Sequence, residues 1–314
     1  MRALPSLARL IRSSRPDVVI STMLHANIVT FAATRLAGAN STLILRETNS
    51  HRAQRDLSRG YRWLGGIAYR RADLVVALSE GVRRELIEDM ELMPERVTTI
   101  PNPVNVAAIG TRIAEARREP SPWPAGVRGP KILGIGRLVP QKAFDVLIDA
   151  AALHVPQARI VLLGDGPERA ALTQRAARRG IADRLSMPGF VEDISPYLAH
   201  ADLFVLSSRW EGFGHVIVEA MAAGLPVVST DCPYGPADIL THEKSGLLVA
   251  NEDADALGQA IRRVLDNQTF RRKLAVEGRK AAARFESEIV ARRYAAALHG
   301  AIERRRGGNA AGNR

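Results

Sequence analysis

Cysteine is almost absent from this sequence of 314 residues, which contains only Cys232. An internal disulfide needs two cysteines and a cysteine-rich metal site needs several, so both are excluded and a reducing compartment is expected. No apolar run reaches the ~18 residues of a membrane-spanning helix. Met1–Leu10 lacks the apolar core of a signal peptide. These absences together predict a cytoplasmic location.

Aromatic residues are also scarce, at 5% of the chain, whereas hydrophobic residues make up 46%. A chain of this length and apolar content is expected to form about two domains. Its charge is biased to one sign, because 44 Lys and Arg outweigh 33 Asp and Glu for a net charge of +11. Such a charge attracts nucleic acid, anionic lipid or phosphorylated substrates without choosing among them. Since no nucleic-acid-binding motif is present, we expect no nucleic acid as a partner.

The first part of the chain alternates short apolar runs with segments of helical pattern. The apolar runs are typical of buried strands and occur at Val18–Ser21, Thr42–Leu45, Asp73–Leu78 and Val97–Ile100. Strands that alternate with helices form parallel sheets with helices on both faces. The pattern therefore predicts an α/β fold with a doubly wound sheet.

A loop with two glutamates is the most informative stretch of the second part. It lies between apolar runs at Ala201–Leu206 and Pro226–Ser229, so the pattern is strand, loop, helix and strand. In parallel sheets, ligands bind where such a loop leaves the carboxyl end of a strand. Glu211 lies in the loop, and Glu219 lies about 7 Å along the helix that follows it.

These residues suit a polyol as ligand. Gly212 and Gly214 let the backbone approach a ligand and leave amides free at the start of the helix. The carboxylates of Glu211 and Glu219 can accept hydrogen bonds from vicinal hydroxyls, as in a sugar or a ribose. Alternatively, both are surface glutamates near a helix N-terminus, where acidic residues are favoured.

A glycine turn follows the strand predicted at Lys131–Ile135. It lacks the third glycine of a dinucleotide-binding fingerprint and the lysine-serine pair of a Walker A loop. It does contain Gly136, followed by Arg137 and Lys142, which bracket a helix start. Two cations at the positive end of a helix can bind a diphosphate. The alternative is that both are solvated surface cations.

Together these motifs resemble those of retaining glycosyltransferases of family 4, which have the GT-B fold of two Rossmann-like domains. The resemblance lies in residues 134–142, 164–167 and 208–226. It implies an enzyme that moves a hexose or N-acetylhexosamine from a UDP-sugar to a glycan or lipid-linked acceptor. Cys-Pro-x-Gly-Pro at 232–236 resembles members that act in surface polysaccharide and lipopolysaccharide synthesis. Asp253–Asp255 matches a metal motif of another glycosyltransferase fold but opens a helix, so no metal or other cofactor is predicted.

The resemblance also implies a role for each motif residue. Arg137 and Lys142 would neutralise the diphosphate and stabilise it as a leaving group. Glu219 would bind the ribose hydroxyls, and Glu211 would bind the hexose. Neighbouring residues would complete the donor site, mainly through their backbone: Gly136, Phe190, Val191, Gly212, Phe213 and Gly214.

The first domain would face the acceptor. His25 follows the first predicted strand, where the resemblance places the transferred sugar; otherwise it is a surface histidine. Relatives carry a histidine near the end of the next strand, and Glu47 or Thr48 replaces it here. The domain is shorter than in the family, so we expect it to lack its first part, as in a fragment or a chain with a misassigned start.

A basic segment with aromatic residues spans 52–71 and includes Tyr61 and Trp63. Such segments bind anionic membranes, although they also occur as solvated arginines over an ordinary core face. Because lipid-linked acceptors are common in the family, we expect contact with the inner face of the cell membrane here.

The predicted domain organisation has five parts. An acceptor-side domain at 1–118 is followed by a linker at 119–130, where Pro and Gly cluster without periodicity. The nucleotide-sugar-binding domain follows at 131–285. A helix at 286–304 is expected to cross back to the first domain, and residues 305–314 are expected to be a disordered basic tail.

Three other functions remain open. A nucleotide-sugar epimerase of the same fold would convert a UDP-sugar without an acceptor. A truncated remnant would bind UDP without activity. A basic nucleic-acid-binding module would bind DNA in a salt-sensitive way without binding UDP.

Overall fold

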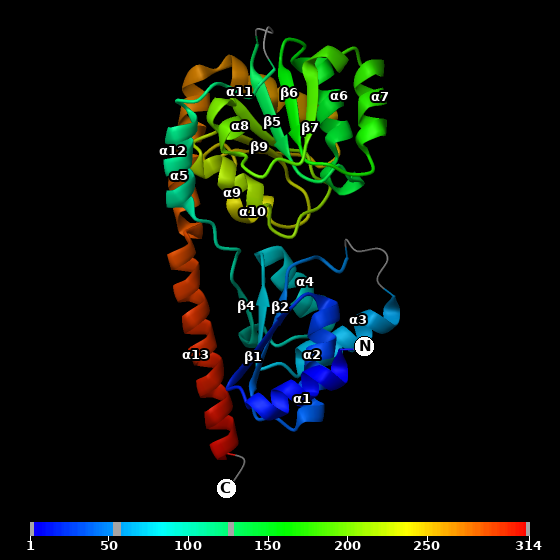
Figure 1. Ribbon diagram of the computed structural model, residues 1–314, viewed down its shortest axis with the longest axis vertical. Helices are drawn as coiled ribbons and strands as arrows, with labels where there is room; N and C mark the ends of the chain where they lie inside the picture. The colour runs from blue at the N-terminus through cyan, green and yellow to red at the C-terminus, as the bar shows by residue number, and fades with distance from the viewer. Residues whose placement is uncertain (1–2, 53–57, 125–128, 312–314) are drawn as a thin grey trace. The chain divides into compact units, whose positions relative to one another are not determined.

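The computed structural model describes residues 3–52, 58–124 and 129–311 (Figure 1). The chain divides into two compact units. Unit 1 contains Met1–Asn102 and Glu288–Arg314, and unit 2 contains Pro103–Ser287. Each unit has one parallel sheet with helices on it, so the α/β prediction is confirmed. In the part of the chain that the structure describes, no helix is both long and apolar enough to cross a bilayer.

Unit 1 is built on a parallel sheet of four strands in the order β1-β2-β3-β4. The strands are β1 (Val18–Thr22), β2 (Thr42–Glu47), β3 (Leu74–Ala77) and β4 (Val97–Thr99). The helices are α1 (Leu4–Ser14), α2 (Leu24–Ala37), α3 (Arg59–Arg70), α4 (Glu80–Met90) and α13 (Ser287–Ala311). The strands lie where the apolar runs predicted them.

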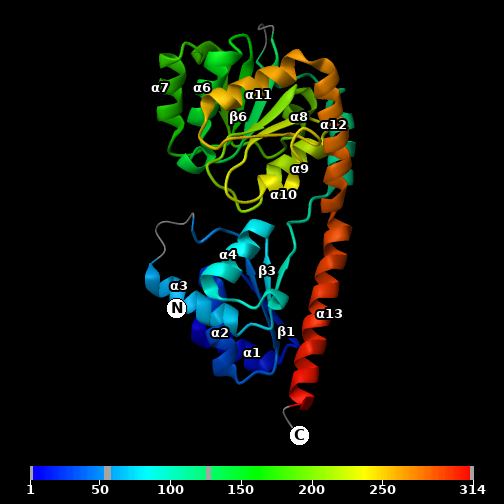
Figure 2. The ribbon, with the colours of Figure 1, turned by 180° about the vertical axis from the view of Figure 1, so that it is seen from behind.

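Helices cover both faces of the sheet in unit 1. Ile44 of β2 packs with Val290 of α13 on one face. Val19 of β1 packs with Ala33 of α2 on the other face. Figure 2 shows α1, α2 and α3 grouped on one side of this sheet. Since both faces are covered, β3 is buried along its whole length and β2 along nearly all of it.

Unit 2 is built on a parallel sheet of six strands in the order β10-β9-β8-β5-β6-β7. The strands are β5 (Lys131–Ile135), β6 (Arg159–Leu163), β7 (Leu185–Gly189), β8 (Leu203–Leu206), β9 (Val227–Thr230) and β10 (Leu247–Val249). The helices are α5 (Val106–Ala116), α6 (Phe144–His154), α7 (Arg169–Arg178), α8 (Ser195–His200), α9 (His215–Ala222), α10 (Pro236–Ile239), α11 (Ala254–Asp266) and α12 (Gln268–Ala282).

The strand order reverses next to β5 in unit 2. From β5 the chain proceeds to β6 and β7 on one side, and β8, β9 and β10 lie on the other. The loops after β5 and β8 therefore leave neighbouring strands at the same edge of the sheet. This is the position where open α/β sheets bind their ligands.

The predicted boundary between the two domains is corrected by the structure. Residues 103–118, predicted to belong to the first domain, belong to unit 2 because α5 packs on α8 and α9. The segment predicted as a linker, 119–130, also lies within unit 2. Its Trp123 is buried, and the indole Nε1 donates a hydrogen bond to the carbonyl of Tyr197 at 3.2 Å. Part of this segment, 125–128, lies outside the described residues.

The predicted disordered tail is also corrected. Residues 305–311 continue α13, and 312–314 lie outside the described residues. An Nη1 of Arg305 donates to Oδ2 of Asp73 at 2.6 Å, and an Nη2 donates to Oδ1 of Asn40 at 3.2 Å. These contacts attach the end of α13 to unit 1, although the basic composition of this segment had indicated disorder.

Candidate functional site

Two loops meet at the reversal of strand order in unit 2. The loop at 136–143 follows β5, and the loop at 207–214 follows β8. The two strands are paired, with Ile132 opposite Leu203. The two motifs that the sequence singled out are therefore brought to one place.

Hydrogen bonds join the two loops along their length. The Ser207 hydroxyl donates to the carbonyl of Lys142 at 2.9 Å. The backbone amide of Arg209 donates to the carbonyl of Gln141 at 2.8 Å, and the Gln141 side chain donates to the carbonyl of Trp210 at 2.9 Å. These three hydrogen bonds hold the two loops together.

Arg209 reinforces this junction with its side chain. Its guanidinium pairs with both oxygens of Asp145, at 2.9 and 3.2 Å, and with Glu252 at 2.8 Å. The hydrogen bonds to Asp145 have the largest effect on the pKa of Arg209 and raise it, and the hydrogen bond to Glu252 raises it further. Ala143, in the loop after β5, has a φ of 47°, a left-handed conformation that costs about 1–2 kcal/mol for a residue with a Cβ. Strain of this kind persists where surrounding contacts hold it in place.

Lys142 and Glu211 form an ion pair between the two loops. The Ser208 hydroxyl donates to the same carboxylate oxygen of Glu211 at 2.7 Å. The side chains of Lys142 and Glu211 are only 15% and 8% exposed. A Cβ on Gly136 would lie 3.0 Å from Cε of Lys142, so this glycine leaves room for the lysine side chain. From the sequence, each residue was predicted to bind a different part of the donor, whereas the structure places the two side chains in contact.

The other charged candidates lie nearby in unit 2 without strong partners. Arg137 is exposed, and its guanidinium makes no hydrogen bond or ion pair with any described residue. Glu219 lies on α9, with its side chain 24% exposed. Burial raises the pKa of this carboxyl, although His215 at 3.8 Å opposes the shift. Both groups have hydrogen-bonding capacity left for a ligand.

The remaining donor-site candidates could contribute through their backbone. The side chain of Phe213 is buried against Phe285, with ring centroids 5.4 Å apart, so only its main chain could meet a ligand. Gly214 directly precedes α9 and has a φ of 94°. Phe190 follows β7 and is 82% exposed, and Val191 beside it is half-buried.

The turn after β6 supports the loop after β5, and this leads to a prediction. A Cβ on Gly164 would lie only 2.1 Å from the carbonyl oxygen of Gly136. We expect Gly164→Ala to reduce the free energy of unfolding of unit 2 by about 1–3 kcal/mol more than a glycine substitution that adds no such contact. Gly180→Ala is the control, because Gly180 also has positive φ but has nothing within 4 Å. Thermal unfolding measures both; equal losses would contradict the prediction.

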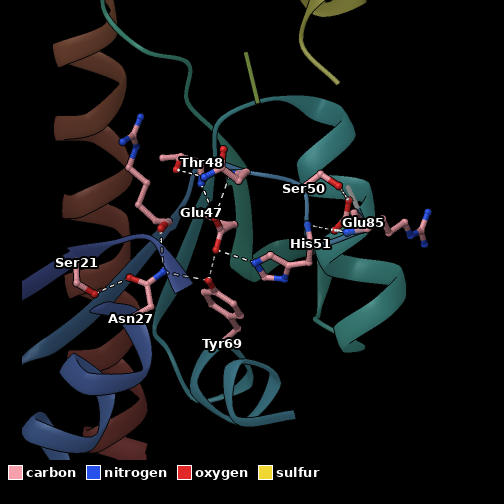
Figure 3. Close-up of polar contacts among 11 residues, drawn as sticks. Ser21, Asn27, Glu47, Thr48, Ser50, His51, Tyr69 and Glu85 are labelled. Carbon is pink, nitrogen blue, oxygen red and sulfur yellow. Dashed lines mark hydrogen bonds and ion pairs between the residues drawn. The ribbon is translucent and has the colours of Figure 1, made fainter. Parts of the chain in front are cut away.

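Unit 1 contains a buried polar network that the sequence did not reveal (Figure 3). Its centre is Glu47, at the end of β2, whose side chain accepts four hydrogen bonds. One oxygen accepts from the backbone amides of Thr48 at 2.8 Å and Asn49 at 3.0 Å. The other contacts Nε2 of His51 at 2.9 Å and the hydroxyl of Tyr69 at 2.6 Å. Although burial opposes it, these hydrogen bonds lower the pKa of Glu47 below its ordinary value.

The network extends to α2 and β1, through Asn27 and Ser21. The side-chain amide of Asn27 donates to the Tyr69 hydroxyl at 3.0 Å and to the carbonyl of Arg46 at 2.9 Å. The Ser21 hydroxyl donates to Asn27 Oδ1 at 2.6 Å. His25, the predicted acceptor-side residue, is exposed near the start of α2 and lies 4.7 Å from the ring of Tyr61.

Sequence reasoning noted Glu47 but could not identify its partners. His51, Tyr69 and Asn27 belong to a loop and two helices, and no spacing rule links them to β2. The signal that was available is weak: a glutamate that ends an otherwise apolar buried strand must find hydrogen-bond donors.

The segment at 52–71 forms a helix over much of its length. In α3, Tyr69 is buried, whereas Tyr61 and Trp63 are exposed. Residues 53–57 of this segment lie outside the described residues. The membrane contact predicted here stays a prediction.

The family of this chain follows from comparison with known proteins. Residues 116–281, just over half of the chain, match the family described as glycosyl transferases group 1. The chain belongs to this family. Residues 1–103 match the glycosyl transferase 4-like domain, so each unit corresponds to a recognised domain. The resemblance drawn from the motifs is confirmed at the level of the family.

Solved structures show the fold of this chain. Anabaena Alr3699/HepE in complex with UDP has a TM-score of 0.84 at 25% identity, over 94% of this chain and 82% of that one. The lipopolysaccharide outer core galactosyltransferase WaaB has a TM-score of 0.77 at 19% identity, over 95% and 79%. With its two parallel-sheet units, the chain has the GT-B fold, as predicted.

Curated relatives include glycosyltransferases of lipopolysaccharide core biosynthesis. The lipopolysaccharide core biosynthesis glycosyltransferase LpsE of Rhizobium meliloti is 38% identical over 149 residues, which are 48% of this chain and 43% of that protein. An N-acetylgalactosaminyltransferase of Campylobacter jejuni that acts on a diphospho-undecaprenol substrate is 24% identical over 74% of this chain and 61% of its own length. The chain thus spans about half the length of these relatives.

Proposed function

We propose that this chain is a retaining glycosyltransferase that moves a hexose or N-acetylhexosamine from a UDP-sugar to a glycan or lipid-linked acceptor. The observation that carries the proposal is the buried Lys142–Glu211 pair at the reversal of strand order in a chain of this family. The relatives named above act in lipopolysaccharide synthesis and on a lipid diphosphate, which supports the same class of acceptor.

Each donor residue has a distinct role in the proposed reaction. Lys142, together with Arg137, faces the diphosphate and stabilises its charge as the bond to the sugar breaks. Glu211 and the backbone of Gly212 and Gly214 bind the hexose hydroxyls. Glu219 accepts hydrogen bonds from the ribose. Its side chain is 24% exposed, so a pair of ribose hydroxyls would supply hydrogen bonds that partial burial has taken from water.

The reaction exchanges one bond for another at the anomeric carbon. The bond from this carbon to the diphosphate oxygen breaks, and the acceptor oxygen bonds to the same face of the sugar. The departing phosphate oxygen takes the acceptor proton, so the reaction needs no separate protein base. The two aspartates of the Asp-x-Asp sequence have other contacts, since Asp253 caps α11 and Asp255 pairs with His154, and the proposed reaction uses no metal ion.

Calorimetric titration of UDP and UDP-N-acetylglucosamine tests the donor site. We expect Glu219→Gln to weaken UDP binding by about tenfold, because two charge-assisted hydrogen bonds to the ribose become neutral ones. Glu277→Gln on α12 is the control, since Glu277 pairs with Lys280 at the surface. A folded chain that does not bind UDP would overturn the proposal, and UDP-sugar conversion without any acceptor would favour an epimerase.

A further inference from the structure

A cavity in unit 1 collects three arginines from distant parts of the chain. Its volume is about 280 Å³, and Ser41 and Leu43 line it at the amino-terminal end of β2. This is the end of the strand opposite to Glu47. The three arginines are Arg35 of α2, Arg71 directly after α3 and Arg305 of α13.

Little negative charge balances these arginines. Among the described residues that line the cavity, none is an aspartate or a glutamate. Arg305 pairs with Asp73 outside it. The guanidinium of Arg35 lies 5.6 Å from the ring centroid of Phe31, and neither it nor that of Arg71 makes a hydrogen bond or ion pair within the described ranges. Three positive charges therefore share one carboxylate.

One donor of this group is buried without an acceptor. The Nε of Arg305 is enclosed and has no hydrogen-bond partner among the described residues. A buried N–H group without an acceptor is costly, so native structures seldom contain one unless a ligand or water supplies the oxygen. This observation is independent of the charge count, and it leaves a donor that an oxygen-bearing ligand or a water molecule could satisfy.

The positive charge continues into a neighbouring cavity. This second cavity, of about 520 Å³, shares Gly38 and Ser41 with the first. Arg12 and Arg15 line it, together with the carboxylate of Asp17. The amino-terminal end of the sheet in unit 1 is thus basic over two adjoining cavities.

We propose that the cavity of Arg35, Arg71 and Arg305 is a binding site for a phosphate ester, distinct from the donor site of unit 2. Planar guanidinium groups match the oxygens of phosphate and bind them through paired hydrogen bonds. The cavity volume of about 280 Å³ is several times the space that a single water molecule needs, which leaves room for a phosphate group. The ester is either a free phosphorylated molecule or the headgroup of an anionic phospholipid.

Titration of inorganic pyrophosphate into the full chain tests the site. UDP is kept in excess so that it occupies the proposed donor site. We expect Arg35→Gln/Arg71→Gln to weaken pyrophosphate binding by about tenfold for each arginine removed, with UDP affinity unchanged. The control is Arg84→Gln/Arg178→Gln, which removes the same charge from two exposed arginines without a hydrogen bond or ion pair to a described residue.

Three outcomes decide the inference. Loss of binding in the cavity variant alone supports it. Equal loss in the control, or no pyrophosphate binding by the parent chain, overturns it. Failure of UDP to bind counts against the proposed function only, because the two variants still report on this cavity.

A second measurement distinguishes the source of the phosphate. The same variants are floated with vesicles of phosphatidylglycerol and phosphatidylcholine. If the cavity variant loses both pyrophosphate and vesicle binding relative to the control, the ligand is a lipid headgroup. If it loses only pyrophosphate binding, the ligand is a free phosphate ester.

Discussion

Replacing Lys142 with methionine is expected to weaken UDP binding ten- to a hundredfold and to slow UDP release from the sugar donor by about 10²–10³. Methionine keeps most of the apolar stem and removes the ammonium group. The diphosphate then loses a cation that faces its charge both before and after the bond breaks. The buried Glu211 carboxylate also loses its counterion and keeps the hydroxyl of Ser208. Calorimetry and a UDP-release assay measure the two effects.

The pairing of Lys142 with Glu211 permits a sharper test with a double variant. Breaking a buried pair by removing one partner costs about 3–5 kcal/mol, because the other charge is left uncompensated. Lys142→Met/Glu211→Gln should therefore recover much of the stability lost in Lys142→Met but none of the UDP release. Lys280→Met is the control, since its pair with Glu277 lies at the surface. Recovery of UDP release in the double variant would contradict a role for Lys142 at the diphosphate.

Replacing Glu47 with glutamine is expected to reduce the free energy of unfolding of unit 1 by about 2–4 kcal/mol. The carboxylate accepts four hydrogen bonds, and both of its oxygens face donors. A glutamine keeps one oxygen, so its NH₂ group meets donors on the other side. Hydrogen exchange of β2 and the loop after it reports on unit 1 separately from unit 2. Glu88→Gln is the control, because Glu88 pairs with Arg52 at the surface.

The same carboxyl gives unit 1 a defined response to acid. The pKa of Glu47 is lower in the folded state than its ordinary value of 4.5. Its contribution to stability is therefore fully present above pH 4.5 and is lost as the pH falls through the folded pKa. Hydrogen exchange of β2 in the parent chain should accelerate over this range more steeply than in Glu47→Gln. Identical pH profiles would show that Glu47 is not ionised in the network.

Local patterns in the sequence were enough to predict the fold and the family. Apolar runs such as Lys131–Ile135 bury both faces of a parallel strand, and glycine-rich loops follow them at regular intervals. The loop with Glu211 and Glu219 and the turn with Lys142 carry short motifs whose residues are close in sequence. Such signals survive without tertiary information because strands, turns and ligand loops are each specified within a few residues.

The domain boundary shows where local patterns fail. A segment rich in proline and glycine has the composition of a linker, yet Trp123 anchors it within unit 2. The chain instead passes between the units at Asn102 and again at Ser287. Burial of a single aromatic side chain can hold such a segment against a domain despite its linker-like composition, because the apolar surface that it removes from water is large.

The sequence by itself determined that this chain has two α/β units, belongs to a glycosyltransferase family and carries its family motifs after two particular strands. Only the tertiary structure decided which of those residues touch. Lys142 and Glu211 meet because β5 pairs with β8, and Glu47 meets Tyr69 because α3, packed on α2, brings Tyr69 to the end of β2. The same holds for Arg35, Arg71 and Arg305, which line one cavity from three segments. Contacts between distant residues depend on strand order and helix packing, and no local pattern encodes either.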